Sequence, residues 1–196
     1  MSKIGEVIES TTTGFIAQAY ELYELPVFGS LVMVVEPDSE IYGFVYQAGT
    51  SSIEPGRRPI ARGKDVPSQE TLYKTNPQLS KLLRSEFNVV TVGYQSGGKI
   101  YQYLPPKPPR IHAFVHTCDA VEIKTFSQSL DFLGLLTIEN MTVPAEELVA
   151  AVLREMSQVQ DDPQAFLVGA GKSLTATLNG DYQRLRAILG RIKVQK

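Results

Sequence analysis

The sequence predicts a mainly β protein with α-helices: a small β-barrel with an inserted helical segment, followed by a small C-terminal helical unit. Residues 1–105 contain short runs of β-branched and aromatic residues that are separated by turn residues. After residue 143, the apolar residues instead recur with the spacing of one face of a helix. The run Pro105-Pro106-Lys107-Pro108-Pro109 is extended by necessity, and it predicts the boundary between a barrel domain at 1–109 and a mainly helical region at 110–196.

The strands of the predicted barrel follow from the apolar runs in the first half of the chain. Leu31-Val32-Met33-Val34-Val35 is continuous, which is typical of a strand that is buried on both faces. Ser96-Gly97-Gly98 lies between two such runs and is a hairpin signal. Strands at this spacing favour a closed barrel, because closure removes exposed sheet edges. The predicted strands are residues 3–9, 15–20, 31–35, 41–46, 88–94 and 99–104.

Helices are predicted in an insertion at residues 54–86 and in the C-terminal unit. Within the insertion, Pro67-Ser68 and Asn76-Pro77 are typical of helix starts. In the C-terminal unit, Pro144 lies in the first turn of an amphipathic helix that extends through Met156. Two further helices, each with an apolar row along one face, are predicted at residues 162–178 and 182–192.

The formal net charge of −2 hides two oppositely charged blocks. Residues 1–54 contain eight acidic residues and one lysine, a net charge of −7. Residues 55–110 contain ten basic and three acidic residues, a net charge of +7. The blocks either pair inside the domain or present complementary faces to neighbouring molecules. If they lie on opposite faces, head-to-tail contact between copies brings unlike charges together, and such contacts can close a ring.

The densest basic run lies in the Gly- and Pro-rich part of the insertion, and it is the predicted binding site. Its residues are Arg57, Arg58, Arg62 and Lys64. A loop of this kind can dock on a protein partner, or it can follow the phosphates of a nucleic acid. A solvated loop with no special role is the third interpretation. Aromatic residues are not interleaved with these charges, which argues against stacking on single-stranded bases.

One segment, Gly169-Ala170-Gly171-Lys172-Ser173, matches the end of a phosphate-binding loop. The complete pattern requires a glycine five residues before Gly171, and Phe166 occupies that position. We therefore interpret the segment as a helix whose small residues let a second helix approach closely. The chain also has no Gly-x-Ser-x-Gly elbow and no spacing that pairs two carboxylates. We expect no enzymatic activity and no cofactor.

The two histidines and the single cysteine fall within seven residues, at His112, His116 and Cys118. On a strand all three would face one side, and on a helix the two histidines would share a face, as metal-binding pairs do. Asp119 could then add an oxygen ligand. The other interpretation is a half-buried segment with exposed imidazoles. We favour the latter and predict no metal site, because no second cluster supplies the remaining ligand and its supporting partners.

Composition predicts a cytoplasmic protein. The chain starts without the apolar run of a signal peptide, and no apolar stretch reaches the roughly 18 residues that a membrane-spanning helix needs. With Cys118 alone, an internal disulfide is excluded, which favours a reducing compartment. We therefore expect no membrane insertion.

Four motifs in the predicted barrel, closing on the proline-rich run, carry a resemblance to a known family. They are Ile4–Thr13, Gly29–Val34, Tyr42–Val45 and Val89–Tyr94. This pattern resembles the HAS-barrel, a small β-barrel named for the HerA helicases and the ATP synthase catalytic-head subunits that share it. In those families the barrel precedes an ATPase core, helps to hold a six-membered ring together and, in HerA, contacts a nuclease partner. The resemblance covers residues 1–110 and implies an assembly or docking module without the ATPase.

The functional prediction is a non-catalytic protein–protein interaction or assembly module. It would bind a protein partner or associate with itself as a homo-oligomer. The alternative is an accessory nucleic-acid-binding protein that uses the basic loop at residues 57–64, with weak binding.

Overall fold

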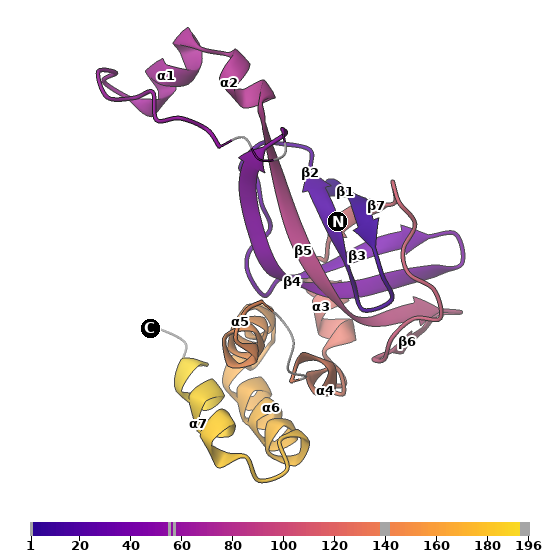
Figure 1. The fold of residues 1–196 in the computed structure, drawn as a ribbon. Coiled ribbons are helices and arrows are strands. Elements are labelled where there is room, and N and C mark those ends of the chain that lie inside the picture. The colour runs from indigo at the N-terminus through magenta and orange to yellow at the C-terminus, as the bar shows by residue number, and fades with distance from the viewer. Residues whose placement is uncertain (1, 55, 57, 138–141, 193–196) are drawn as a thin grey trace.

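The computed structural model of the protein describes residues 2–54, 56, 58–137 and 142–192, and it has the predicted fold class (Figure 1). Six antiparallel strands pair in the order β2-β1-β7-β3-β4-β5, and β2 also pairs with β5, which closes the barrel. β6 adds to β5 as an extra strand outside the ring. The strands are β1 (Ser2–Ser10), β2 (Gly14–Ala19), β3 (Leu31–Glu36), β4 (Ser39–Ser52), β5 (Leu83–Ser96), β6 (Lys99–Tyr101) and β7 (Phe114–Thr117).

Strand β3 is buried on both faces along most of its length, as predicted. Val32 and Val34 belong to the apolar core inside the barrel. Leu31 and Met33 belong to a second core on the outer face of the barrel. The prediction included Val35 and is wrong there, because Val35 is 46% exposed at the end of the strand.

The outer core joins the barrel to the C-terminal helices. Phe44 on β4 packs against Phe132, with ring centroids 5.1 Å apart, and against Phe126 at 6.3 Å. Leu148 and Leu153 of α5 are fully buried in the same core. The helices therefore cover one side of the barrel wall and share its core (Figure 1). These helices are α3 (Ala120–Phe126), α4 (Leu133–Leu136), α5 (Ala145–Ser157), α6 (Pro163–Thr177) and α7 (Tyr182–Arg191), of which α3 and α4 were not predicted.

The sixth strand of the barrel comes from the region that the sequence analysis assigned to the mainly helical part. In β7, Val115 is paired with Gly5 of β1 on one side and with Val34 of β3 on the other. The barrel therefore extends past the predicted boundary at Pro109, as far as Thr117. The proline-rich run is an extended connection that returns the chain to the barrel, and Ser10 Oγ donates a hydrogen bond to the Pro109 carbonyl at 2.6 Å.

Strand β5 begins earlier than predicted, at Leu83, inside the segment interpreted as helical or loop. It pairs with β4 from Glu40↔Gln95 to Ser52↔Leu83, so the two strands form a long ribbon. The sequence did not predict this extra length because the buried residue in it, Ser85, is polar. Ser85 is 1% exposed, and its hydroxyl shares a hydrogen bond with Thr50 Oγ1 at 2.7 Å.

No helix in the described part of the chain has the length and apolar content that crossing a lipid bilayer requires.

Candidate functional site

The insertion forms a lobe, residues 53–82, at the end of the β4–β5 ribbon. The ladder ends at Ser52↔Leu83, and the Ile53 N–H then donates to the Leu82 carbonyl at 2.9 Å, so the lobe begins and ends at one point. In Figure 1 the lobe projects from the end of the barrel that lies away from α5, α6 and α7. It contains the two predicted helices, α1 (Gln69–Thr75) and α2 (Gln78–Lys81).

Tyr23, in the loop after β2, holds the lobe against the barrel. Its hydroxyl lies 2.6 Å from the hydroxyl of Tyr73 on α1, and the two rings meet edge to face. Its backbone N–H donates to Ser85 Oγ at 2.9 Å, at the base of the ribbon. The backbone of Tyr23 adopts a φ of 70°, which is unusual for a residue other than glycine and costs conformational energy. The contacts with Tyr73 and Ser85 offset this cost.

The lobe exposes much of its apolar surface. Neither α1 nor α2 contains a buried residue. Ile60 is 77% exposed, and Leu82 is 43% exposed. A pocket of about 350 Å³ opens between the extended part of the lobe and the two helices, with Leu72 and Leu79 among the residues that line it. Exposed apolar side chains around a pocket are typical of an interaction surface.

The predicted binding residues lie on this lobe. Arg58 and Arg62 line the pocket, and Lys64 follows them in the chain. All three are exposed, and none forms an ion pair with another described residue. Their charges are thus available to a binding partner. The fourth predicted residue, Arg57, lies outside the described residues.

A second surface lies at the base of the lobe, and we call residues 20–28 the acidic segment. It contains Tyr23, so the contact with Tyr73 places it beside the lobe. Glu21 and Glu24 are exposed and form no ion pair with another described residue. Val27 is 59% exposed, which adds apolar surface to the two free carboxylates.

A cluster of three aromatic residues lies at the other end of the barrel. Tyr94, Tyr101 and Tyr103 form a cluster with ring centroids 5.1 to 5.7 Å apart, and Lys99 lies over Tyr101. Tyr94 and Leu83 mark nearly opposite ends of β5, about 35 Å apart along the strand. This tyrosine cluster and the basic lobe are therefore separate features, and Tyr73 is the aromatic residue that lines the lobe's pocket together with Arg58 and Arg62.

The structure does not bring His112, His116 and Cys118 together as one cluster. Among the described residues, no group of three histidine, cysteine or acidic side chains lies close enough together to hold a metal ion. His112 has a φ of 69° and its Nδ1 lies 2.5 Å from Glu6 Oε1, on the barrel surface. Cys118 packs against the outer core, where burial raises the pKa of its thiol above the ordinary value.

The segment Gly169–Ser173 lies in the middle of α6, as a continuous helix. Its backbone N–H groups are therefore engaged within the helix and cannot surround a phosphate. Ala170 is fully buried, and a Cβ built on Gly171 would lie 3.5 Å from Leu189 Cδ2 of α7. The segment thus packs inside the helical unit, but the spacing at Gly171 is that of an ordinary van der Waals contact, so α7 comes no closer there than an alanine would allow.

Sequence reasoning found the basic residues of the lobe but missed the acidic segment beside it. The signal was present, because Glu21-Leu22-Tyr23-Glu24 combines acidic and aromatic residues outside the predicted strands. Its position beside the lobe depends on the contact between Tyr23 and Tyr73, which no local pattern indicates. No protein-family model matches the chain, and none of the curated proteins matches it either. The resemblance to the HAS-barrel thus stays a prediction.

Proposed function

We propose that this protein is a non-catalytic assembly module that associates with a second copy of itself through the lobe and the acidic segment. One observation carries the proposal. Unpaired Arg58 and Arg62 border an apolar pocket, and unpaired Glu21 and Glu24 lie beside exposed apolar residues next to that lobe. A surface that combines both signs of charge with exposed apolar side chains is complementary to itself.

The symmetry of the assembly follows from where the two surfaces lie. Head-to-tail contact requires complementary surfaces on opposite faces of the molecule. Here the hydrogen bond between Tyr23 and Tyr73 places the first part of the acidic segment, with Glu21 and Glu24, beside the lobe at one end of the barrel. A two-fold axis at this end brings the lobe of each copy onto the acidic segment of the other. The proposed assembly is therefore a closed dimer.

The apolar and charged residues have different roles in such a contact. Burial of Ile60, which is 77% exposed in the single chain, and of Tyr23, which is 50% exposed, supplies affinity. The arginines and glutamates at the rim align the two copies and speed their encounter, and salt weakens this effect. Association is thus expected to become slower and weaker, without being abolished, as the salt concentration rises.

Light scattering over a range of protein and salt concentrations tests the proposal. The wild-type protein is expected to have twice the chain mass. Each contact pairs residues 58 and 62 of one copy with residues 21 and 24 of the other. Arg58→Glu with Arg62→Glu therefore gives each contact four negative charges, and Glu21→Lys with Glu24→Lys gives each contact four positive charges. Each double variant alone should be monomeric. An equimolar mixture of the two double variants should recover the dimer mass, because the unlike charges then meet again.

The matched control is Lys107→Glu with Arg186→Glu, which reverses two exposed basic residues that lie outside both surfaces and have no described ion pair. This variant should remain dimeric. A wild-type protein that is monomeric at every concentration contradicts self-association, as does a dimer that both charge reversals leave intact. Nucleic-acid binding tighter than about 1 µM at physiological salt, lost in Arg58→Ala with Arg62→Ala, would favour the alternative function.

A further inference from the structure

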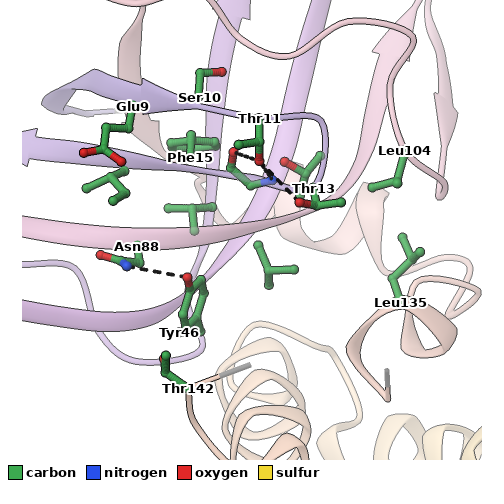
Figure 2. A pocket seen from close by; sticks show the side chains of 15 residues that line it. Glu9, Ser10, Thr11, Thr13, Phe15, Tyr46, Asn88, Leu104, Leu135 and Thr142 are labelled. Carbon is green, nitrogen blue, oxygen red and sulfur yellow. Dashed lines mark hydrogen bonds between the residues drawn. The ribbon is translucent and has the colours of Figure 1, made fainter. Parts of the chain in front are cut away.

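A separate pocket of about 450 Å³ opens on the barrel wall, away from the lobe. In Figure 2 the loop between β1 and β2 borders it on one side, and Leu104 and Leu135 lie on the other. Its volume is within the range of small-molecule sites, roughly 300–1,000 Å³.

The floor of this pocket is apolar and is flanked by polar groups at fixed positions in the sheet. Ile16 of β2 pairs with Glu9 of β1 on one side and with Asn88 of β5 on the other. Paired residues on neighbouring strands point to the same face of the sheet. Glu9 and Asn88 therefore lie on either side of Ile16 on that face. The two polar residues are therefore about 10 Å apart, the width of two strand spacings.

The polar groups around the floor are mostly free to bind. Glu9 is exposed, and its carboxylate has no hydrogen bond or ion pair with another described residue. Asn88 Nδ2 reaches Tyr46 Oη only at 3.5 Å, the limit of a hydrogen bond, and its Oδ1 atom has no described donor (Figure 2). The site thus offers acceptor oxygens on both sides of the apolar floor.

The charge of the residues that line the pocket determines which charge a ligand should carry. Glu9 is the only charged residue among the described residues that line the pocket, and no lysine, arginine or histidine takes part. Phosphates and carboxylates would meet a negative charge without compensation. An ammonium group instead gains a charge-assisted hydrogen bond with the carboxylate.

We propose that the barrel-wall pocket binds small organic cations, namely amines that carry an apolar body. The ammonium group donates to the Glu9 carboxylate, and the apolar body covers Ile16 between the strands. Because Glu9 is exposed to water, its contribution to affinity is modest, and it is weakened further by salt.

Three probes of nearly equal shape test the proposal by NMR on the ¹⁵N-labelled full-length chain: phenethylamine, 2-phenylethanol and 3-phenylpropionate. The amide signals of Thr13, Ile16 and Asn88 should shift with phenethylamine. The affinity should be about twofold to fivefold higher for phenethylamine than for the alcohol, and lowest for the carboxylate. In Glu9→Gln, phenethylamine should bind no better than the alcohol, whose own affinity should change little.

Two further variants test whether the probes bind at this pocket and whether the loss of affinity is specific to the Glu9 carboxylate. Ile16→Trp fills the pocket and should abolish the shifts for all three probes, while its spectrum shows that the barrel is still folded. Glu155→Gln removes a carboxylate on α5 and should leave all affinities unchanged. The proposal is overturned if no probe shifts these signals, if the shifts lie elsewhere, or if the preference for phenethylamine survives Glu9→Gln. It does not depend on self-association, because the lobe takes no part in it.

Discussion

Gly29 lies in direct contact with Ala151, where the loop before β3 meets helix α5. A Cβ atom built on Gly29 would be 2.8 Å from the Cβ and from the carbonyl carbon of Ala151, and the φ of Gly29 is 85°. Its N–H donates to the Val45 carbonyl at 2.7 Å, which fixes the loop to β4. Only a residue without a side chain fits here, so the distance between the barrel and α5 is set at this point.

Replacement of Gly29 by alanine is expected to loosen the contact between barrel and helices. Gly180 is a matched control, because its φ is 91° but nothing lies within 4 Å of a Cβ built on it. Gly180→Ala should lower the free energy of unfolding by about 1 kcal/mol, the cost of the left-handed backbone alone. Gly29→Ala should cost at least about 2 kcal/mol more, because it also forces the two elements apart. Urea denaturation measures both, and equal losses would contradict the contact.

Removal of the hydroxyl of Tyr73 is expected to free the lobe without unfolding the barrel. In Tyr73→Phe, the bond to Tyr23 is lost while the ring remains. Such an exposed bond contributes about 1 kcal/mol or less. Hydrogen exchange at residues 69–75 should become faster, and exchange in β3 should stay unchanged. Tyr182→Phe, at a tyrosine that is 75% exposed, serves as the control. Unaltered exchange at 69–75 would show that the bond does not restrain the lobe.

Thr91→Val is expected to stabilise the protein. Thr91 is 1% exposed, and its Oγ1 atom has no hydrogen-bond partner among the described residues. Valine has the same shape, so the exchange removes the cost of an unsatisfied buried hydroxyl without opening a cavity. The free energy of unfolding should rise by about 1 kcal/mol or more. A decrease in the denaturation midpoint would mean that the hydroxyl is satisfied in solution. Thr177→Val, at an exposed helical position, controls for the substitution itself.

The attachment of α7 to α5 is expected to weaken in acid. A hydrogen bond from its own backbone N–H, and a second from Arg184 Nε at 2.6 Å, hold the pKa of Glu146 below the usual range. The folded-state pKa is thus below the unfolded value of about 4.3. The stabilisation is present above the unfolded value and is lost as the pH falls through the folded value. Glu146→Gln should therefore show a smaller decrease of Tm than the wild type below about pH 4.3.

The control for this experiment is Glu155→Gln, on the same helix. Glu155 forms no ion pair with another described residue, so its replacement should leave the pH profile of the wild type unchanged. Parallel Tm curves for the wild type and Glu146→Gln would contradict the role of Arg184.

The part of the fold that depends on local patterns was predictable from the sequence. Alternation and turn residues placed the first four strands, and helical spacing placed α5, α6 and α7. Strand β7 was missed because only Val115 is buried among its four residues, so no alternation of apolar residues marks it. Its place in the sheet is fixed by β1 and β3, which are distant in sequence. Whether such a short segment forms a strand depends on its pairing with distant strands and not on the β-propensity of its residues.

Only the charged residues of the candidate site could be predicted from the sequence. Exposed basic residues in a Gly- and Pro-rich loop are visible from the sequence, and Arg58, Arg62 and Lys64 are exposed as expected. The pocket beside them needs Leu72, Leu79 and Leu82 to converge from two helices, which depends on the path of the lobe. The pairing of Glu9 and Asn88 around Ile16 likewise depends on sheet register across three strands. Such register is set by the whole sheet and by no single segment.

The late position of β7 in the chain has a consequence for synthesis of the protein. β1 is made first, but one of its edges stays unpaired until residues 114–117 leave the ribosome, and the same holds for β3. Between the synthesis of β3 and that of β7, the nascent chain therefore carries two open strand edges, which are templates for pairing with other chains. A ribosome that stalls within the proline-rich run would hold the chain in this state. A product truncated there would aggregate, although it contains five of the six strands of the barrel.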